Sequence, residues 1–261
     1  MKLASCEEMP SIRKFFHLKN NDLTTVTWAQ NINSNKAFQW ALNGKKMMIG
    51  GDVIVVQMGF GKNKKPVPKM YSHYNNDIEM TLKQLLEKAA DTKSFGVQLN
   101  FNQITVFIES IKVLQAMRGK IKFPLWLNAD TDNMEDKDID NFLSLCTHNF
   151  PKATISIGML HKGQKLRSEQ GYNAKLVTQM KDTLTRNNVT QTVAFPVEAH
   201  VASYSLDTLP ALKDVHGITD SALYIYNRQI KVYSRSLLCG KEVTEKPQPS
   251  WSSVRSPSRC S

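Results

Sequence analysis

The sequence has few cysteines and no long apolar run, and each shortage argues against a class of protein. No stretch of about 18 consecutive apolar residues occurs in the chain, so no transmembrane helix is expected. The four cysteines, Cys6, Cys146, Cys239 and Cys260, stand far apart without a C-x-x-C pair. This spacing argues against a zinc cluster, a thioredoxin-like redox motif and a dense disulfide framework.

The sequence also lacks the patterns of a signal peptide and of a dinucleotide-binding turn. Glu7, Glu8 and Arg13 interrupt the N-terminal stretch that a signal peptide would need to be apolar. Gly59 and Gly61 stand without a G-x-G-x-x-G continuation, which argues against a nicotinamide or flavin nucleotide site. The sequence therefore leaves the compartment unknown, and no cofactor is expected.

Acidic residues are the minority charge. The chain has 34 basic and 23 acidic residues, a formal net charge of +11. Such an excess favours anionic partners, such as phosphates, acidic lipid surfaces or nucleic acid. Part of it lies in residues 61–69, GKNKKPVPK, which include Lys69. We interpret this segment as a solvated basic loop, with a binding patch as the alternative. No aromatic residues interleave with its lysines, so nucleic acid is not an expected partner there.

Short apolar runs alternate with amphipathic stretches along most of the chain. Predicted strands cover residues 24–28, 47–56, 95–101, 123–129, 154–158, 192–197 and 222–226. Helical stripes at i, i+3, i+4 and i+7 lie between them, beginning at Leu82, Ile104 and Leu176. Strand–helix units in series predict right-handed crossovers and a parallel sheet. Seven or eight such units favour an α/β fold of the TIM-barrel type, with an open sheet as the alternative.

The predicted organisation is one domain with two flanking segments. We assign residues 1–14 to an N-terminal extension, 15–236 to the barrel domain and 237–261 to a disordered tail. The tail is rich in serine, proline and charge and has no periodicity. Residues 229–234 form a candidate eighth strand, but no helix long enough to close a barrel follows. The barrel is therefore expected to be incompletely closed.

Polar residues gather where the predicted strands end, which is where barrels of this kind place their functional groups. Asp52 is the most informative, because a carboxylate inside an apolar run is costly to bury unless it is paired, hydrogen-bonded or metal-bound. Its alternative is a satisfied core aspartate. Asp130 ends the fourth strand, where an aspartate often caps a turn. His73 lies in the loop after the second strand.

Three segments together resemble the menorin family: TWAQNINS at 27–34, MIGGDV at 48–53 and WLNAD at 126–130. Supporting segments are MYSH at 70–73, GVQLNF at 96–101, ISIG at 155–158 and FPV at 195–197. The match runs in order from about residue 15 to residue 226. Menorin domains look like distant relatives of glycerophosphodiester phosphodiesterases and phospholipase-C-type barrels. The resemblance thus implies a phosphodiesterase-like plan, and for some members a cell-surface or extracellular role.

Carried over residue by residue, the resemblance implies a depleted catalytic site. The family has a histidine at the position of Gln30, and Glu-Ala-Asp where this chain has Gly50, Gly51 and Asp52. Its third strand offers Lys, Asp and Lys, where this chain has Gln98, Asn100 and Asn102. The aromatic after its Ser-x-Gly segment is replaced by Met159. The matching positions that keep the family residue are Asp52, His73, Asn128, Asp130 and Gly158.

These departures predict a non-catalytic binding or interaction protein, a pseudoenzyme. Its partner is expected to be a protein or an anionic, phosphate-bearing ligand held by Gln30, Asn100, Asn128 and Lys69. The first alternative is a slow metal-dependent phosphodiesterase, with His73 and Asp52 as catalytic groups and Mg²⁺ or Ca²⁺ weakly bound by Asp52 and Asp130. The second is a simple anion- or nucleic-acid-binding domain.

Overall fold

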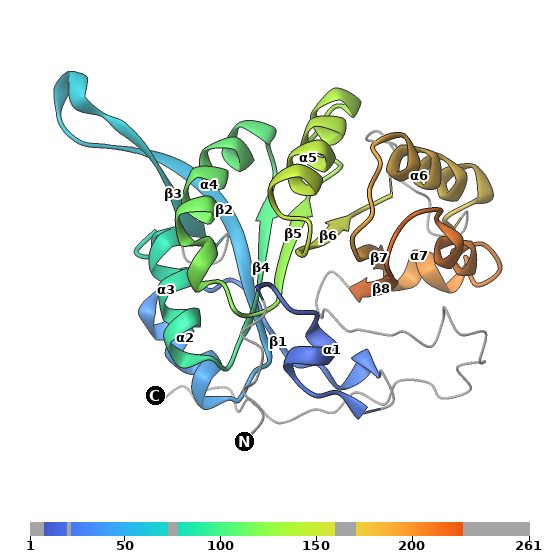
Figure 1. Cartoon of the computed structure of the whole chain (residues 1–261), viewed down its shortest axis with the longest axis horizontal. Coiled ribbons are helices and arrows are strands. Elements are labelled where there is room, and N and C mark those ends of the chain that lie inside the picture. The colour runs from blue at the N-terminus through green and yellow to red at the C-terminus, as the bar shows by residue number, and fades with distance from the viewer. Residues whose placement is uncertain (1–7, 20–21, 73–77, 160–170, 227–261) are drawn as a thin grey trace, which may run out of the picture.

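Strands and helices alternate along the chain in the computed structural model, which describes residues 8–19, 22–72, 78–159 and 171–226 (Figure 1). The strands are β1 (Trp28–Ala29), β2 (Met48–Met58), β3 (Lys65–Tyr71), β4 (Gly96–Phe101), β5 (Leu125–Ala129), β6 (Thr154–Ile157), β7 (Val193–Glu198) and β8 (Ser221–Tyr226). The α-helices are α1 (Ile12–Phe15), α2 (Asn35–Asn43), α3 (Leu82–Thr92), α4 (Ile104–Met117), α5 (Asp136–Asn149), α6 (Ala174–Arg186) and α7 (Ala199–Ser203). Short 3-10 turns include η2 (Leu23–Thr25), η3 (Gly61–Asn63), η4 (Arg118–Lys120) and η6 (Leu209–Asp214).

The strands form one curled sheet with the order β1-β2-β4-β5-β6-β7-β8, and each neighbouring pair in this order is parallel. The sheet curls until its two ends approach each other. The centroid of the Trp28 ring on β1 lies 5.5 Å from that of the Tyr224 ring on β8. Within the described residues, no backbone ladder joins β1 to β8. The fold is therefore an incompletely closed α/β barrel, which confirms the predicted class.

Local signals in the sequence set where the helices begin. Thr81 and Gln84 form a capping box at the start of α3, with the Thr81 hydroxyl accepting from the Gln84 backbone N–H at 3.1 Å. Ser34 and Asn173 cap α2 and α6 with side-chain oxygens that accept from the backbone N–H of Ala37 and Leu176.

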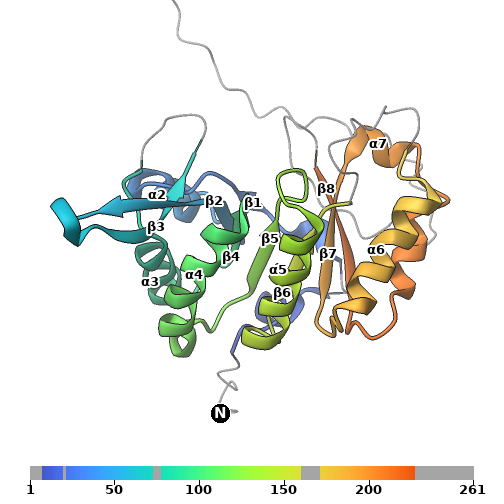
Figure 2. The same ribbon diagram turned by 90° about the horizontal axis from the view of Figure 1, so that it is seen from above.

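The predicted apolar stripe of α3 is buried throughout. Those of α4 and α6 are buried in part, because Ile108 is exposed and Ile104 and Leu176 are half-buried. The buried stripe residues pack with alternate residues of the strands in one large core cluster between helices and sheet (Figure 2).

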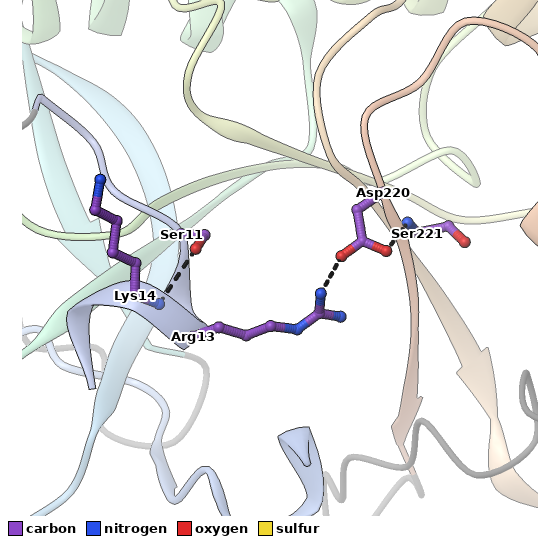
Figure 3. A network of polar contacts seen from close by, with 5 residues as sticks. All are labelled: Ser11, Arg13, Lys14, Asp220 and Ser221. Atoms are coloured by element: carbon purple, nitrogen blue, oxygen red, sulfur yellow. Dashed lines mark hydrogen bonds and ion pairs between the residues drawn. The ribbon is translucent and has the colours of Figure 1, made fainter. Parts of the chain in front are cut away.

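A second, smaller core fills the inner side of the curled sheet. Strand residues such as Met48 and Trp126 meet Ile12 of α1 and Leu23 there. Next to Ile12, Arg13 forms an ion pair with Asp220, which also accepts a hydrogen bond from the Ser221 backbone N–H at the start of β8 (Figure 3). The N-terminal helix is thus attached to the last strand of the sheet.

The predicted first strand at 24–28 is wrong in its bounds. Residues Leu23–Thr25 form a 3-10 turn, and the strand is the short Trp28–Ala29. The cause is Asp22, whose carboxylate accepts hydrogen bonds from the Thr24 backbone N–H at 2.8 Å and from the Thr24 hydroxyl at 2.6 Å. Such local side-chain bonds compete with strand pairing.

The interpretation of residues 61–69 as a loop is also wrong. Residues Lys65–Tyr71 form β3, which pairs antiparallel with β2 from Met58↔Lys65 to Asp52↔Tyr71. Pro68 and Met70 are buried on one face, while Lys65 and Lys69 occupy the other. Pro66 and Pro68 are tolerated because β2 is the one strand of the sheet that β3 pairs with in the described residues, and the isolated bridge on its other side lies at Lys69. The candidate eighth strand at 229–234 and the segment 237–261 lie outside the described residues.

Candidate functional site

The inner face of the curled sheet carries a polar row near the carboxyl ends of its strands. Asp52 on β2 is in register with Asn100 on β4, which is in register with Asn128 on β5. The next partner in the row is Ser156 on β6. Cross-strand partners share one face of a sheet, so these four side chains point the same way. Two residues earlier in register stand Gly50, Gln98 and Trp126.

The polar side chains of this region are bonded to one another. The Asn100 amide donates from Nδ2 to Asp52 Oδ1 at 2.9 Å. The Ser156 hydroxyl donates to Asn128 Oδ1 at 2.7 Å, and Gln30 Nε2 donates to Gln98 Oε1 at 3.1 Å. Asn100 is 8% exposed, and its Oδ1 accepts no hydrogen bond from the described residues. One buried acceptor in the row is therefore left unsatisfied, at an energetic cost to the fold.

A cavity of about 320 Å³, which we call the cup, opens over this row. Its polar lining residues are Asp52, Gln98, Asn100, Asn102, Asn128, Asp130, Thr131, Asp132, Tyr172, Tyr224 and Tyr226. Ala129, Gly158, Met159 and Pro196 complete the lining. The described lining contains three aspartates and no lysine, arginine or histidine, so the net charge of +11 is carried elsewhere on the molecule.

Asp130 is tied to its own turn. Its Oδ1 accepts from the Asp132 backbone N–H at 3.1 Å, and its Oδ2 accepts from Asn133 Nδ2 at 2.8 Å. Both carboxylate oxygens therefore serve the turn after β5, which is the turn-capping alternative considered from the sequence. Asp52 is half-buried, and its Oδ1 takes the Asn100 amide.

Tyr172 is brought to the cup from a distant part of the chain. Its phenol oxygen accepts a hydrogen bond from the Glu198 backbone N–H at 2.8 Å, at the end of β7. Burial raises the pKa of Tyr172 well above its ordinary value, although the hydrogen bond from Glu198 works in the opposite direction. The phenol is therefore neutral at physiological pH.

The other site residues predicted from the sequence are not part of the described lining of the cup. Gln30 is not among the lining residues, but its Nε2 donates to Gln98, which is one of them. Lys69 is on β3, where its Nζ donates to the backbone carbonyl of Ile78 at 3.1 Å. His73 lies outside the described residues. The structure thus gathers Asp52, Asn100, Asn128 and Asp130 at one cavity, and bonds Gln30 to the lining residue Gln98.

The donor set at the cup does not fit a divalent cation. Mg²⁺ and Ca²⁺ prefer several hard oxygen ligands, mostly carboxylates aimed at one point. Both oxygens of Asp130 are already bonded, and the Asn100 NH₂ group, a donor, is directed at Asp52. Across the part of the chain that the structure describes, no three His, Cys, Asp or Glu side chains gather as metal ligands.

Sequence reasoning missed several residues of the cup. Tyr224 and Tyr226 alternate at the end of a predicted strand, and this period-two pattern would have placed them on one face. Ser156, which supports the lining residue Asn128 through a hydrogen bond, stands inside the quoted ISIG segment. Tyr172 and Thr131 lie outside strands, and no local pattern marks them.

Comparison with known proteins identifies the class of this barrel. The family model described as the Menorin N-terminal domain matches residues 22–239, so the chain belongs to the menorin family, as the resemblance predicted. The human protein FAM151B is 26% identical over 204 residues, which cover 74% of this chain and 72% of that protein. A crystal structure of a glycerophosphodiester phosphodiesterase from Parabacteroides distasonis superposes with a TM-score of 0.44 at 15% identity, covering 75% of this chain and 77% of that one. Within the described residues, the helices are too short or too polar to span a bilayer.

Proposed function

We propose that this menorin-family chain is a non-catalytic binding protein whose ligand occupies the cup. The observation that carries the proposal is the pairing of Asn100 with Asp52 at 2.9 Å, which leaves an amide where the family resemblance expects a second carboxylate. Phosphodiester cleavage needs one group that takes a proton and one that gives a proton. Side-chain amides do neither at neutral pH.

The residue at position 30 supports the same interpretation. Gln30 stands where the resemblance places a histidine, and its amide is engaged with Gln98. Loss of one acid/base partner typically lowers a rate by a factor of about 10²–10⁴. Here the acid/base partner and two carboxylates are replaced together, at Gln30, Gly50 and Asn100. Efficient turnover is not expected from the groups that remain.

The chemistry of the lining favours a neutral, hydroxyl-bearing ligand over a free phosphate. Three aspartates without a described basic residue repel an anion. Each amide offers both a donor and an acceptor, as each hydroxyl of a polyol does. Asn100 and Asn128 place side-chain amides in the lining, and Tyr224 and Tyr226 add aromatic rings to it. The ligand class that fits is therefore a cyclic polyol or saccharide.

A slow metal-dependent phosphodiesterase is the alternative, which the poor fit of the cup to a divalent cation disfavours although Asp52, Asp130 and Asp132 line one cavity. It predicts hydrolysis that needs a cation and is abolished by Asp52→Asn. A general anion- or nucleic-acid-binding domain predicts salt-sensitive binding that is indifferent to changes in the cup.

One ligand panel separates these functions. Myo-inositol, glycerophosphocholine and inorganic phosphate are titrated into the purified chain by calorimetry, and product release is followed with Mg²⁺, Ca²⁺ or chelator. We expect heat of binding with myo-inositol and no released product. Asn128→Ala should lower the affinity for myo-inositol about tenfold, because one neutral hydrogen-bonding group is removed. Lys175→Ala, an exposed change on α6, is the matched control.

The contrary outcomes are distinct. Cation-dependent product release that disappears in Asp52→Asn overturns the non-catalytic assignment. Binding of inorganic phosphate in place of myo-inositol overturns the ligand class.

A further inference from the structure

A hairpin made by β2 and β3 projects beyond the body of the protein. The partners of β2 on β4 stop at Val53, whereas β2 continues to Met58 paired with β3. Five residues of β2 therefore lie past its last partner on β4, a length of roughly 17 Å at about 3.3 Å per residue. Figures 1 and 2 both show this hairpin extending away from the other elements.

The turn at its end displays a phenylalanine. Phe60 is 95% exposed and stands between Gly59 and Gly61, whose φ angles are +121° and +58°. Residues that carry a Cβ rarely adopt these backbone angles, and a Cβ on Gly59 would lie 2.7 Å from the backbone oxygen of Asn63. The two glycines make the turn that holds Phe60 away from the body. Met58, beside it, is 45% exposed.

The charge of the hairpin has one sign. Residues 53–71 contain four lysines and no aspartate or glutamate. Lys62, Lys64 and Lys65 are exposed around the tip, and Lys65 is the cross-strand partner of Met58. An exposed apolar tip is thus surrounded by cations, at a distance from the aspartates of the cup.

We propose that this hairpin is a docking element for anionic membrane surfaces. An apolar tip ringed by lysines suits such a surface, because the aromatic enters the boundary between headgroups and acyl chains while the ammonium groups meet lipid phosphates. A single aromatic at the tip does not provide the successive stacking surfaces of a single-stranded nucleic-acid site. The hairpin therefore matches a lipid surface better than a nucleic acid.

The hairpin leaves the sheet on the same edge as the cup. β2 runs from Met48 toward Met58, so its tip lies beyond the carboxyl end of the strand. Asp52, which lines the cup, pairs with Tyr71 at the base of the hairpin. Docking through Phe60 therefore brings the carboxyl-end edge of the barrel to the lipid. The proposal does not depend on what the cup binds.

Vesicle sedimentation tests the docking. The full chain is mixed with phosphatidylcholine vesicles with or without phosphatidylserine, at low and raised salt. We expect binding that requires phosphatidylserine and weakens with salt. Phe60→Ser should lower the partition coefficient by about tenfold or more through loss of one buried aromatic. Changing Lys62, Lys64 and Lys65 to Gln should lower it on the order of a hundredfold, at about fivefold for each lysine near the surface.

Matched controls separate this site from general charge and hydrophobicity. Leu206→Ser removes another exposed apolar residue, which is 53% exposed. Lys120, Lys152 and Lys213, all exposed, are changed together to Gln to give the same loss of net charge. Both controls should bind as the unaltered chain does. Phe60→Trp should retain binding and shift its emission to the blue with vesicles.

Three results would overturn the proposal. The first is that the unaltered chain does not bind anionic vesicles. The second is that the Phe60→Ser and triple-lysine variants bind as strongly as the unaltered chain. The third is that the control variants lose as much binding as the hairpin variants. Salt-sensitive binding of a nucleic acid that ignores Phe60, with no vesicle binding, would assign the lysines to that partner. The exposure of Phe60 makes misfolding of these variants unexpected, and thermal unfolding verifies this.

Discussion

Position 50 shows how backbone packing and site chemistry are linked at the scale of one residue. Gly50 lies on β2 beside Gln98 of β4, and a Cβ at this position would stand 2.7 Å from the Gln98 backbone oxygen. The family resemblance places a glutamate here. Because of this close approach, a side chain at position 50 requires β2 or β4 to shift.

Substitution of Gly50 by alanine tests this packing. The added methyl group must push β2 from β4, and we expect Gly50→Ala to lower the free energy of unfolding by about 1–3 kcal/mol. Urea denaturation provides the measurement. Gly119→Ala is the control, because a Cβ there meets nothing within 4 Å. Equal stability of the two variants would contradict the close approach of β2 to β4.

At the scale of elements, α5 and α6 are joined by a charged contact. Asp140 on α5 accepts from Arg186 Nη2 at 2.6 Å and from Asn187 Nδ2 at 2.7 Å. Burial raises the pKa of Asp140, but the hydrogen bonds from Arg186 and Asn187 outweigh burial, and the pKa lies below its ordinary value. The charged form is therefore favoured more in the folded state than in the unfolded chain.

The sign of this pKa shift predicts an acid-labile contribution. Because the folded pKa is below the unfolded value, the contribution is present above the unfolded pKa of about 3.9 and is lost as pH falls through the folded pKa. Both side chains are partly exposed, so solvent screening limits it to about 0.5 kcal/mol. Arg186→Gln should lower the free energy of unfolding by this amount near neutral pH, and by almost nothing at about pH 2.

Urea denaturation at the two pH values measures this contribution. Lys175→Gln, on the same helix, is the control and should show no such pH-dependent difference. A stability loss in Arg186→Gln that stays constant with pH would refute the assignment to Asp140.

The hairpin and the helices differ in how clearly their sequences indicate them. α5 carries a stripe of Ile139, Phe142, Leu143 and Cys146 that has full helical spacing, although it was not among the predicted helices. In β3 the lysines and prolines obscure the period-two pattern, because both residue types are typical of loops. Pairing with β2 overrides that local preference.

On the scale of the whole molecule, the N-terminal helix contributes to holding the open barrel together. Arg13 and Asp220 pair across 207 positions of sequence, and their side chains are 22% and 31% exposed. Ile12 enters the inner core beside this ion pair. The contact links α1 to the start of β8, the strand at the end of the sheet.

A double-mutant cycle measures this link. Arg13→Ala, Asp220→Asn and the double variant are compared by urea denaturation. We expect a coupling of about 1 kcal/mol, because the pair is only partly exposed to solvent screening. The exposed pair Lys112–Glu109 on α4 is the control, with a coupling of about 0.3 kcal/mol. A coupling near zero for Arg13 and Asp220 would remove the ion pair from the stabilising contacts.

The sequence by itself determined the α/β class, the predicted helices and the presence of amides at positions 30 and 100, where the family resemblance leads us to expect ionisable groups. These follow from local periodicity and from single positions, which need no knowledge of distant neighbours. The turn that Asp130 caps is also local, because its carboxylate bonds only span to Asp132 and Asn133, and turn capping was an alternative that the sequence already offered. Only the tertiary structure decided that the Tyr172 phenol reaches the cup and that Phe60 stands at the tip of a projecting hairpin. Both depend on strand register or on contacts between segments apart in the chain, and no local pattern encodes them.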